Sequence, residues 1–138
     1  FFKNELGYLF QNFGLLENAT VAANLELGLI GQKWTKQEKK QREEEVLEKV
    51  GLDYLALDQK IYELSGGEAQ RVALAKVILK DPPLILADEL TAALDPETSQ
   101  EIMNLLLSLK KPDRLMIIAT HNPAIWEKAD EVIRLNTI

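Results

Sequence analysis

The chain contains short runs that are apolar at every position. The two clearest are Leu84–Ala87 and Leu115–Ala119. Strands of this kind are buried on both faces, which is typical of a parallel sheet that is covered by helices. Two further segments, Gly7–Phe10 and Val132–Leu135, predict additional strands.

Between these runs, apolar residues recur at helical spacing. The predicted helices span residues 18–30, 36–50, 67–80, 96–109 and 123–128. Most side chains of 36–50 are charged, and we expect them to form a solvated face, with Gly51 ending the helix. The segment 52–63 is expected to be irregular. Because strands and helices alternate along the chain, the sequence predicts an α/β fold.

Polar residues follow three of the predicted strands. Gln11 comes after the first strand, Asp88 and Glu89 after the second, and His121 near the end of the third. Ligands of parallel α/β sheets bind at the carboxyl ends of the strands. The sequence therefore predicts that these four side chains gather along one edge of the sheet.

Composition and charge exclude several kinds of site and partner. The chain has 138 residues, the size of one ordinary domain, and a formal net charge of −6. This acidic balance gives no general attraction to nucleic acid or to anionic lipid. The chain has no cysteine, which excludes disulfides and thiolate metal sites. No apolar run approaches the roughly 18 residues that a membrane-spanning helix needs.

The stretch ELSGGEAQR at 63–71 supports two interpretations of the same geometry. Ser65 followed by Glu68 matches a capping box, in which the two residues cap the start of a helix. The N-terminus of a helix also presents free N–H groups and a positive dipole end. Gly66 and Gly67 would let a phosphate come close to these groups.

The acids and the histidine also have both a structural and a chemical interpretation. Asp88 can hold Mg²⁺, which prefers oxygen ligands, and Glu89 can orient or deprotonate a water. His121, the only histidine, can donate a hydrogen bond to a phosphate. In the simpler interpretation these are polar residues of strand ends and turns. Asp95, which precedes Pro96, is most simply an N-cap.

Taken together, the order and spacing of these motifs resemble the ATP-binding-cassette (ABC) ATPase family over essentially the whole chain. LSGGEAQRVALAK, from Leu64, is similar to the signature sequence of that family, and LILADE, ending at Glu89, to its Walker B strand. ALD at 93–95 is similar to the D-loop, His121 to the switch histidine, and LGYLFQ, ending at Gln11, to the strand that leads into the Q-loop. The stretches FQNFGLLENATVAANLELGL and ADEVIRL are most similar to the lipoprotein-release and peptide-export branch.

The resemblance implies that the complete domain uses ATP and Mg²⁺. The residues implied to bind nucleotide are Gln11, Ser65, Gly66, Gly67, Glu68 and Asp95. Asp88 and Gln11 would hold or sense Mg²⁺, Glu89 would be the general base, and His121 would stabilise the γ-phosphate. The signature would bind a nucleotide held by the other subunit of a dimer, and Asp95 would lie at the dimer contact.

The resemblance also implies an organisation and partners. The fold would be part of a P-loop NTPase, with a helical subdomain at about 12–80 and residues 1–11 and 81–138 in the core. The partners would be a second nucleotide-binding domain and a transmembrane permease, with no nucleic acid. The protein would then be cytoplasmic, at the inner face of the membrane, contacting the membrane only through the permease.

Some positions depart from the family pattern. Leu90 stands where proline is usual, Ala92 where serine or glycine is common, Ala69 where glutamine is frequent, and Asn122 where aspartate is frequent. None of these removes a group that the mechanism requires. The larger departure is that none of the glycines begins a Walker A loop, G-x-x-x-x-G-K-[ST], which would hold the phosphates of ATP.

Three interpretations of this absence remain open. The chain is a truncated ATPase that binds ATP weakly or not at all, a natural split half of the kind found in chromosome-maintenance ATPases, or a non-catalytic interaction fragment. The position of Gln11 and a compact helical region ahead of the signature favours the transporter ATPase over the split half. On this view the chain is expected to expose strand edges and to self-associate.

Overall fold

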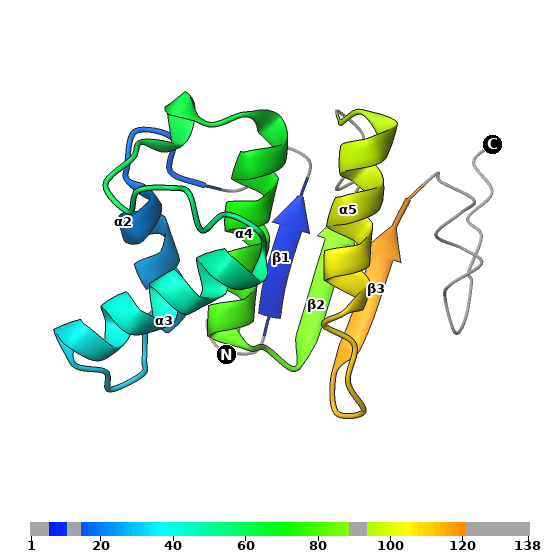
Figure 1. Cartoon of the computed structure of the whole chain (residues 1–138). Helices are drawn as coiled ribbons and strands as arrows, with labels where there is room; N and C mark the ends of the chain where they lie inside the picture. Colours follow the sequence, from blue (N-terminus) through cyan, green and yellow to red (C-terminus); the bar gives the residue numbers. More distant parts are fainter. Residues whose placement is uncertain (1–5, 11–14, 89–93, 121–138) are drawn as a thin grey trace.

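The computed structural model describes residues 6–10, 15–88 and 94–120. Its strands form one parallel sheet in the order β1-β2-β3 (Figure 1). They are β1 (Leu6–Phe10), β2 (Leu84–Asp88) and β3 (Leu115–Ala119), with Leu6 opposite Leu84 and Leu84 opposite Leu115. The predicted parallel α/β sheet is confirmed for these strands. The predicted helix at 123–128 and strand at 132–135 lie outside the described residues.

Helices occupy the segments between the strands. They are α2 (Val21–Glu26), α3 (Lys36–Lys49), α4 (Gly66–Lys80) and α5 (Pro96–Leu107), with short 3₁₀ helices η1 (Leu27–Leu29) and η2 (Ile61–Glu63). The predicted helices at 36–50 and 67–80 are confirmed to within one residue. Gly51 lies directly after the C-cap of α3, where the sequence predicted the helix to end. Its positive φ of 78° suits glycine, and an added Cβ would lie 2.8 Å from Arg71 Nη1.

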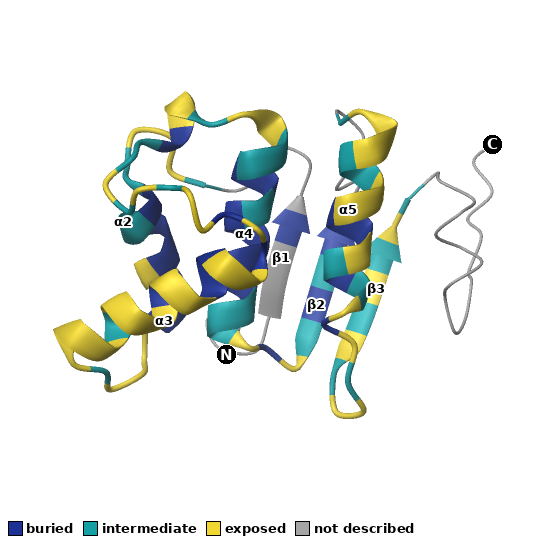
Figure 2. Ribbon diagram, in the orientation of Figure 1, coloured by how far each residue is buried: buried dark blue, intermediate teal, exposed yellow. Residues whose placement is uncertain are grey.

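Two apolar clusters meet at α4. Leu74 and Val77 pack with the sheet and with α5, whereas Val72 and Ala75 pack with α2 and α3. Figure 1 shows α4 and α5 across the same face of the sheet, with α2 and α3 beyond α4. Figure 2 shows α4 buried along most of its length and α3 largely exposed. Helix α4 thus joins the sheet layer to the helical layer.

Two sequence predictions about burial are wrong. Leu115 and Ile117 are exposed, while Met116 and Ile118 pack against the core, so β3 is not buried on both faces. Among the described residues, helices cover one face of this strand. The charges of α3 do not all form a solvated face either. Glu43 is only 4% exposed, because it shares the buried stripe of Val46 and Leu47.

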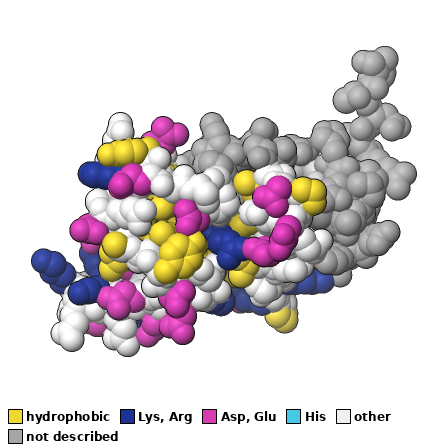
Figure 3. Space-filling view, turned by 45° about the horizontal axis from the view of Figure 1, so that its top comes forward, with side chains coloured by type: hydrophobic (Ala, Val, Ile, Leu, Met, Phe, Trp, Pro, Cys, Tyr) yellow, Lys and Arg dark blue, Asp and Glu magenta, His cyan; other side chains and the backbone are white. Residues whose placement is uncertain are grey.

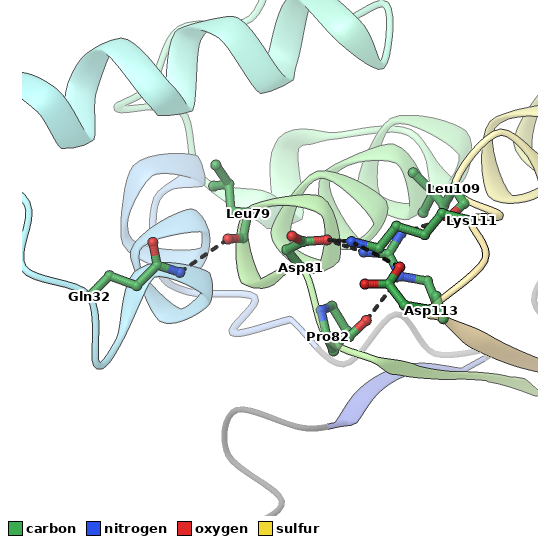
Figure 4. A network of polar contacts seen from close by, with 8 residues as sticks. Gln32, Leu79, Asp81, Pro82, Leu109, Lys111 and Asp113 are labelled. Atoms are coloured by element: carbon green, nitrogen blue, oxygen red, sulfur yellow. Dashed lines mark hydrogen bonds and ion pairs between the residues drawn. The ribbon is translucent and has the colours of Figure 1, made fainter.

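A polar network fixes the points where β2 and β3 begin (Figure 4). The Arg114 guanidinium donates to the carbonyl oxygens of Pro82 and Leu109, at 2.9 and 2.7 Å, and to the carboxylate of Asp81. Lys111 Nζ lies 3.1 Å from the same carboxylate. Asp81 ends α4 in the left-handed conformation, with φ of 48°. One buried guanidinium therefore joins the end of α4 to the entry of both strands.

A buried amide secures the start of α2. Asn24 Oδ1 accepts from the Leu16 amide at 2.8 Å, and Nδ2 donates to the carbonyl oxygens of Leu16 and Thr20 at 3.1 and 2.9 Å. Thr20 is the N-cap of α2, and its Oγ1 accepts from the Ala23 amide at 3.0 Å. These bonds satisfy the polar atoms of a fully buried side chain and hold the segment from Leu16 onward against the helix.

None of the described helices is long and apolar enough to cross a membrane.

Candidate functional site

The predicted capping box is present at the start of α4. Ser65 Oγ accepts from the Glu68 amide at 3.1 Å, and Glu68 Oε1 accepts from the Ser65 amide at 2.9 Å. Ser65 and Gly66 are exposed. The first amides of a helix have no intrahelical acceptor. In this cap the amide of Glu68 donates to Ser65. Within the described residues, this leaves the amides of Gly66 and Gly67 outside the helix's own hydrogen bonding, at its positive end.

A second helix begins beside this one. Asp95 is the N-cap of α5 and its Oδ2 accepts from the Thr98 amide at 3.1 Å. The bonds from Thr98 hold the pKa of Asp95 below its usual value. Gly67 lies against Thr98, and Arg71 forms an ion pair with Glu101. Asp95 and the residues Ser65–Gly67 therefore come from adjacent helix N-termini.

These N-termini lie at the end of the sheet to which the strands point (Figure 1). At that edge Asp88 ends β2, aligned with Phe10 of β1 and Ala119 of β3. Asp88 is exposed. The structure thus brings Asp88 to the carboxyl edge as predicted. Three further predicted residues, Gln11, Glu89 and His121, lie outside the described residues.

The end of the molecule that carries both helix N-termini has a mixed surface. Figure 3 brings this end forward and shows acidic side chains spread among hydrophobic and basic ones. Its described part carries no continuous basic patch. The mixed charges of this described face accompany a formal net charge of −6 for the whole chain.

The exposed carboxylate of Asp88 suits Mg²⁺ that arrives with a nucleotide. Mg²⁺ keeps several waters and is usually held by one or two carboxylates together with phosphate oxygens. Within the described ranges, no group of three or more His, Cys, Asp and Glu side chains gathers as a preformed metal site. A single exposed carboxylate at a strand end, as Asp88 provides, fits such a shared Mg²⁺–phosphate site.

A cavity of about 450 Å³ lies at the opposite end of α4. It is lined by residues of α3 and by the last turn of α4, among them Val46, Lys49, Leu79 and Lys80. Gln32 also lines it, and its side chain donates to the Leu79 carbonyl oxygen at 3.3 Å (Figure 4). The cavity is thus separated from Ser65 by the length of α4.

One contact of Glu68 was not predicted from the sequence. The Tyr54 hydroxyl donates to Glu68 Oε2 at 2.6 Å. Tyr54 lies in the irregular segment between α3 and η2, where no periodicity marks a residue as facing the signature. The sequence marks Tyr54 only as a polar aromatic residue two positions after an apolar one, Leu52.

The contact between Gly67 and Thr98 leads to a testable prediction. Gly67→Ala is expected to lower the free energy of unfolding by about 1–3 kcal/mol through overpacking. The reason is that an added Cβ would lie 2.7 Å from Thr98 Cγ2. Urea denaturation measures the loss. Adding Thr98→Ser, which removes that methyl group, should restore most of the stability. A double variant as unstable as the single one would contradict this explanation.

Comparisons with known proteins identify the family of this chain. The sequence profile of the ABC transporter family matches residues 1–92. The uncharacterized ABC transporter ATP-binding protein YvrO of Bacillus subtilis is 42% identical over 132 residues, covering 95% of this chain and 57% of that protein. The methionine import ATP-binding protein MetN 2 of Oenococcus oeni is 37% identical over 116 residues, covering 84% and 32%.

A solved structure is similar as well. The dimeric ATP-binding cassette MJ0796 in a post-hydrolysis state, bound to ADP and Pi, superimposes with a TM-score of 0.76 at 34% identity. The match covers 89% of this chain and 55% of that chain. The present chain therefore spans a little over half the length of several such relatives.

Proposed function

The chain belongs to the ABC transporter family, and on this premise we propose that it is part of an ATP-binding subunit that couples ATP hydrolysis to transport. The observation that carries the proposal is the capped N-terminus of α4 at Ser65, which lies at the same end of the fold as Asp88. A helix N-terminus with two glycines binds phosphate, and a strand-end carboxylate binds Mg²⁺.

In this proposal each predicted residue has a role. Ser65, Gly66 and Gly67 bind the γ-phosphate of a nucleotide held by a second subunit, and Glu68 belongs to the same nucleotide-binding set. Asp95 lies at the contact between the subunits. Asp88 and Gln11 hold or sense Mg²⁺. ATP supplies the phosphoryl group, and catalysis consists mainly of positioning and charge stabilisation. Glu89 deprotonates the attacking water and His121 donates to the γ-phosphate.

We propose a helical subdomain at about 12–80 and a core made of residues 1–11 and 81–138. The separate apolar cluster of α2, α3 and one side of α4 supports this division. The partners in this proposal are a second copy, as in the dimeric cassette MJ0796, and a membrane permease. The permease would hold the protein at the inner face of the membrane.

The finer assignment concerns the cargo. We propose export or release of a peptide, lipid-linked or drug-like substrate, on the similarity of FQNFGLLENATVAANLELGL and ADEVIRL to that branch. One relative is named for methionine import. Reconstitution of the ATP-hydrolysing chimera described below with the permease in vesicles, measuring the direction in which a labelled peptide moves, distinguishes export from import.

The 138 residues contain no Walker A loop, so we expect them alone to bind ATP weakly or not at all and not to hydrolyse it. Calorimetry with Mg²⁺ and ATP tests the first expectation. Dissociation constants of about 1 mM or tighter, with turnover that Glu89→Gln abolishes, would contradict it.

Function is tested in a chimera that places the Walker A-bearing part of a relative such as YvrO ahead of Phe1. The chimera is expected to hydrolyse ATP, and Glu89→Gln is expected to reduce kcat by at least about 100-fold, the lower end for a lost general base. Glu48→Gln, an exposed position on α3, is the matched control and should leave kcat unchanged. Equal turnover in the two variants would contradict the proposed function.

A further inference from the structure

We propose that Tyr54 is a positioning residue for the signature, holding Glu68 so that Ser65 stays fixed as the N-cap that faces the phosphate. This inference rests on the proposed function and adds a residue outside the recognised motifs. Three bonds form the chain of contacts. Tyr54 donates to Glu68 Oε2 at 2.6 Å, the Ser65 amide to Glu68 Oε1 at 2.9 Å, and the Glu68 amide to Ser65 Oγ at 3.1 Å.

The two oxygens of Glu68 are held from different segments. One accepts from the cap of its own helix, and the other from a residue fourteen positions earlier in the chain. A capping-box glutamate bonded only to its own cap can rotate and share that bond with water. The bond from Tyr54 fixes the orientation of the carboxylate, and with it the backbone of Ser65.

The backbone around Tyr54 is itself held firmly. Leu52 is buried and its amide donates to the Leu47 carbonyl oxygen at 2.7 Å, while the Leu55 amide donates to the Leu52 carbonyl oxygen at 3.0 Å. The Tyr54 side chain is nevertheless 66% exposed. Because little of its ring is packed, we infer that Tyr54 acts on Glu68 through the hydrogen bond from its hydroxyl.

Electrostatics reinforce this arrangement. The hydrogen bond from Tyr54 is the main cause that lowers the pKa of Glu68, followed by the bond from the Ser65 backbone. The same bond raises the pKa of Tyr54. Near neutral pH the phenol therefore remains a donor and the carboxylate remains an acceptor, which is the pairing that a charge-assisted bond requires. The carboxylate of Glu68 is therefore oriented toward the Tyr54 hydroxyl.

The test compares Tyr54→Phe with Tyr62→Phe. Tyr62 is also 66% exposed, and no side-chain hydrogen bond from it is seen among the described residues, so the two variants lose the same hydroxyl at equal exposure. In the 138-residue chain, NMR titration should show the pKa of Glu68 rising in Tyr54→Phe alone. Amide exchange at Ser65 should become roughly threefold faster, as expected for one lost solvent-exposed bond.

The link to catalysis is tested in the ATP-hydrolysing chimera. Tyr54→Phe is expected to lower kcat roughly threefold, in proportion to the looser cap, with the thermal midpoint unchanged from that of Tyr62→Phe. An unchanged pKa of Glu68 and unchanged Ser65 exchange would overturn the positioning role. So would a loosened cap with full kcat. A chimera without turnover that depends on Glu89 would instead contradict the proposed function, and the NMR measurements would still decide whether Tyr54 fixes Ser65.

Discussion

Replacing Leu74 by alanine is expected to lower the free energy of unfolding by about 3–5 kcal/mol, because the substitution leaves a cavity that cannot collapse. Leu74 is fully buried at the centre of α4 and packs with Ile85 of β2 and with Ile102 and Leu106 of α5. The other side of α4 packs with α2 and α3. A helix held from two sides cannot shift to fill the gap without opening the second cluster.

Urea denaturation of the chain measures this loss through the midpoint and the slope. Leu16→Ala is the matched control, since the side chain of Leu16 is 57% exposed. That variant should change stability by less than about 1 kcal/mol. If Leu74→Ala costs no more than Leu16→Ala, then α4 does not have the central place in the core described above.

The second large effect is a dependence of stability on pH that comes from Glu43. Burial is the main cause that raises the pKa of its carboxyl from 4.5 to about 7. Glu26 of α2 and Glu44 raise this pKa further, and Lys39 opposes them. Within the described residues, Glu43 Oε1 has no hydrogen-bond partner. The folded chain therefore favours the protonated form of this side chain.

The sign follows from proton binding. Between pH 4.5 and about 7 the folded chain binds the Glu43 proton and the unfolded chain has released it, so stability falls as pH rises. The contribution is complete below pH 4.5 and is lost above pH 7. A shift of this size corresponds to a stability loss on the order of 3 kcal/mol.

Glu43→Gln removes the titrating group and keeps the shape of the side chain. Its free energy of unfolding should therefore stay nearly flat from pH 5 to 8, apart from the contributions of other groups. Glu48→Gln, on the exposed side of the same helix, should keep the decline of the unsubstituted chain. Chemical denaturation at several pH values checks this. Parallel pH profiles for Glu43→Gln and Glu48→Gln would rule out Glu43 as the source.

Local rules were sufficient for much of the fold and for part of the site. The capping box of Ser65 and Glu68, the cap at Asp95 and the stop at Gly51 depend on neighbouring residues, and the structure has all of them. The parallel sheet followed from the uniformly apolar runs, and Asp88 lies at its carboxyl edge as expected. The caps and the stop depend on short-range sequence alone, which is why they could be predicted, whereas the sheet was inferred from the apolar runs and the alternation of strands and helices.

Features that depend on tertiary contacts were harder to predict. Glu43 lies three, four and seven positions before Val46, Leu47 and Val50, so it occupies the buried stripe of α3. That spacing is a signal for its burial, but the surrounding charges favoured a solvated face. Tyr54 gave no such signal, because its contact with Glu68 joins two segments whose approach is set by the packing of α3 against α4.

The guanidinium of Arg114 bears on the order in which the chain folds. It joins the beginnings of β2 and β3, which are linked by the single crossover helix α5, so its contacts close a loop of moderate length. Strand β1 pairs with β2 from much farther along the chain. Loop closure costs more entropy as the separation grows, and non-local strand pairing is slow. We therefore expect the crossover unit to form the nucleus of the sheet, and β1 to join it late.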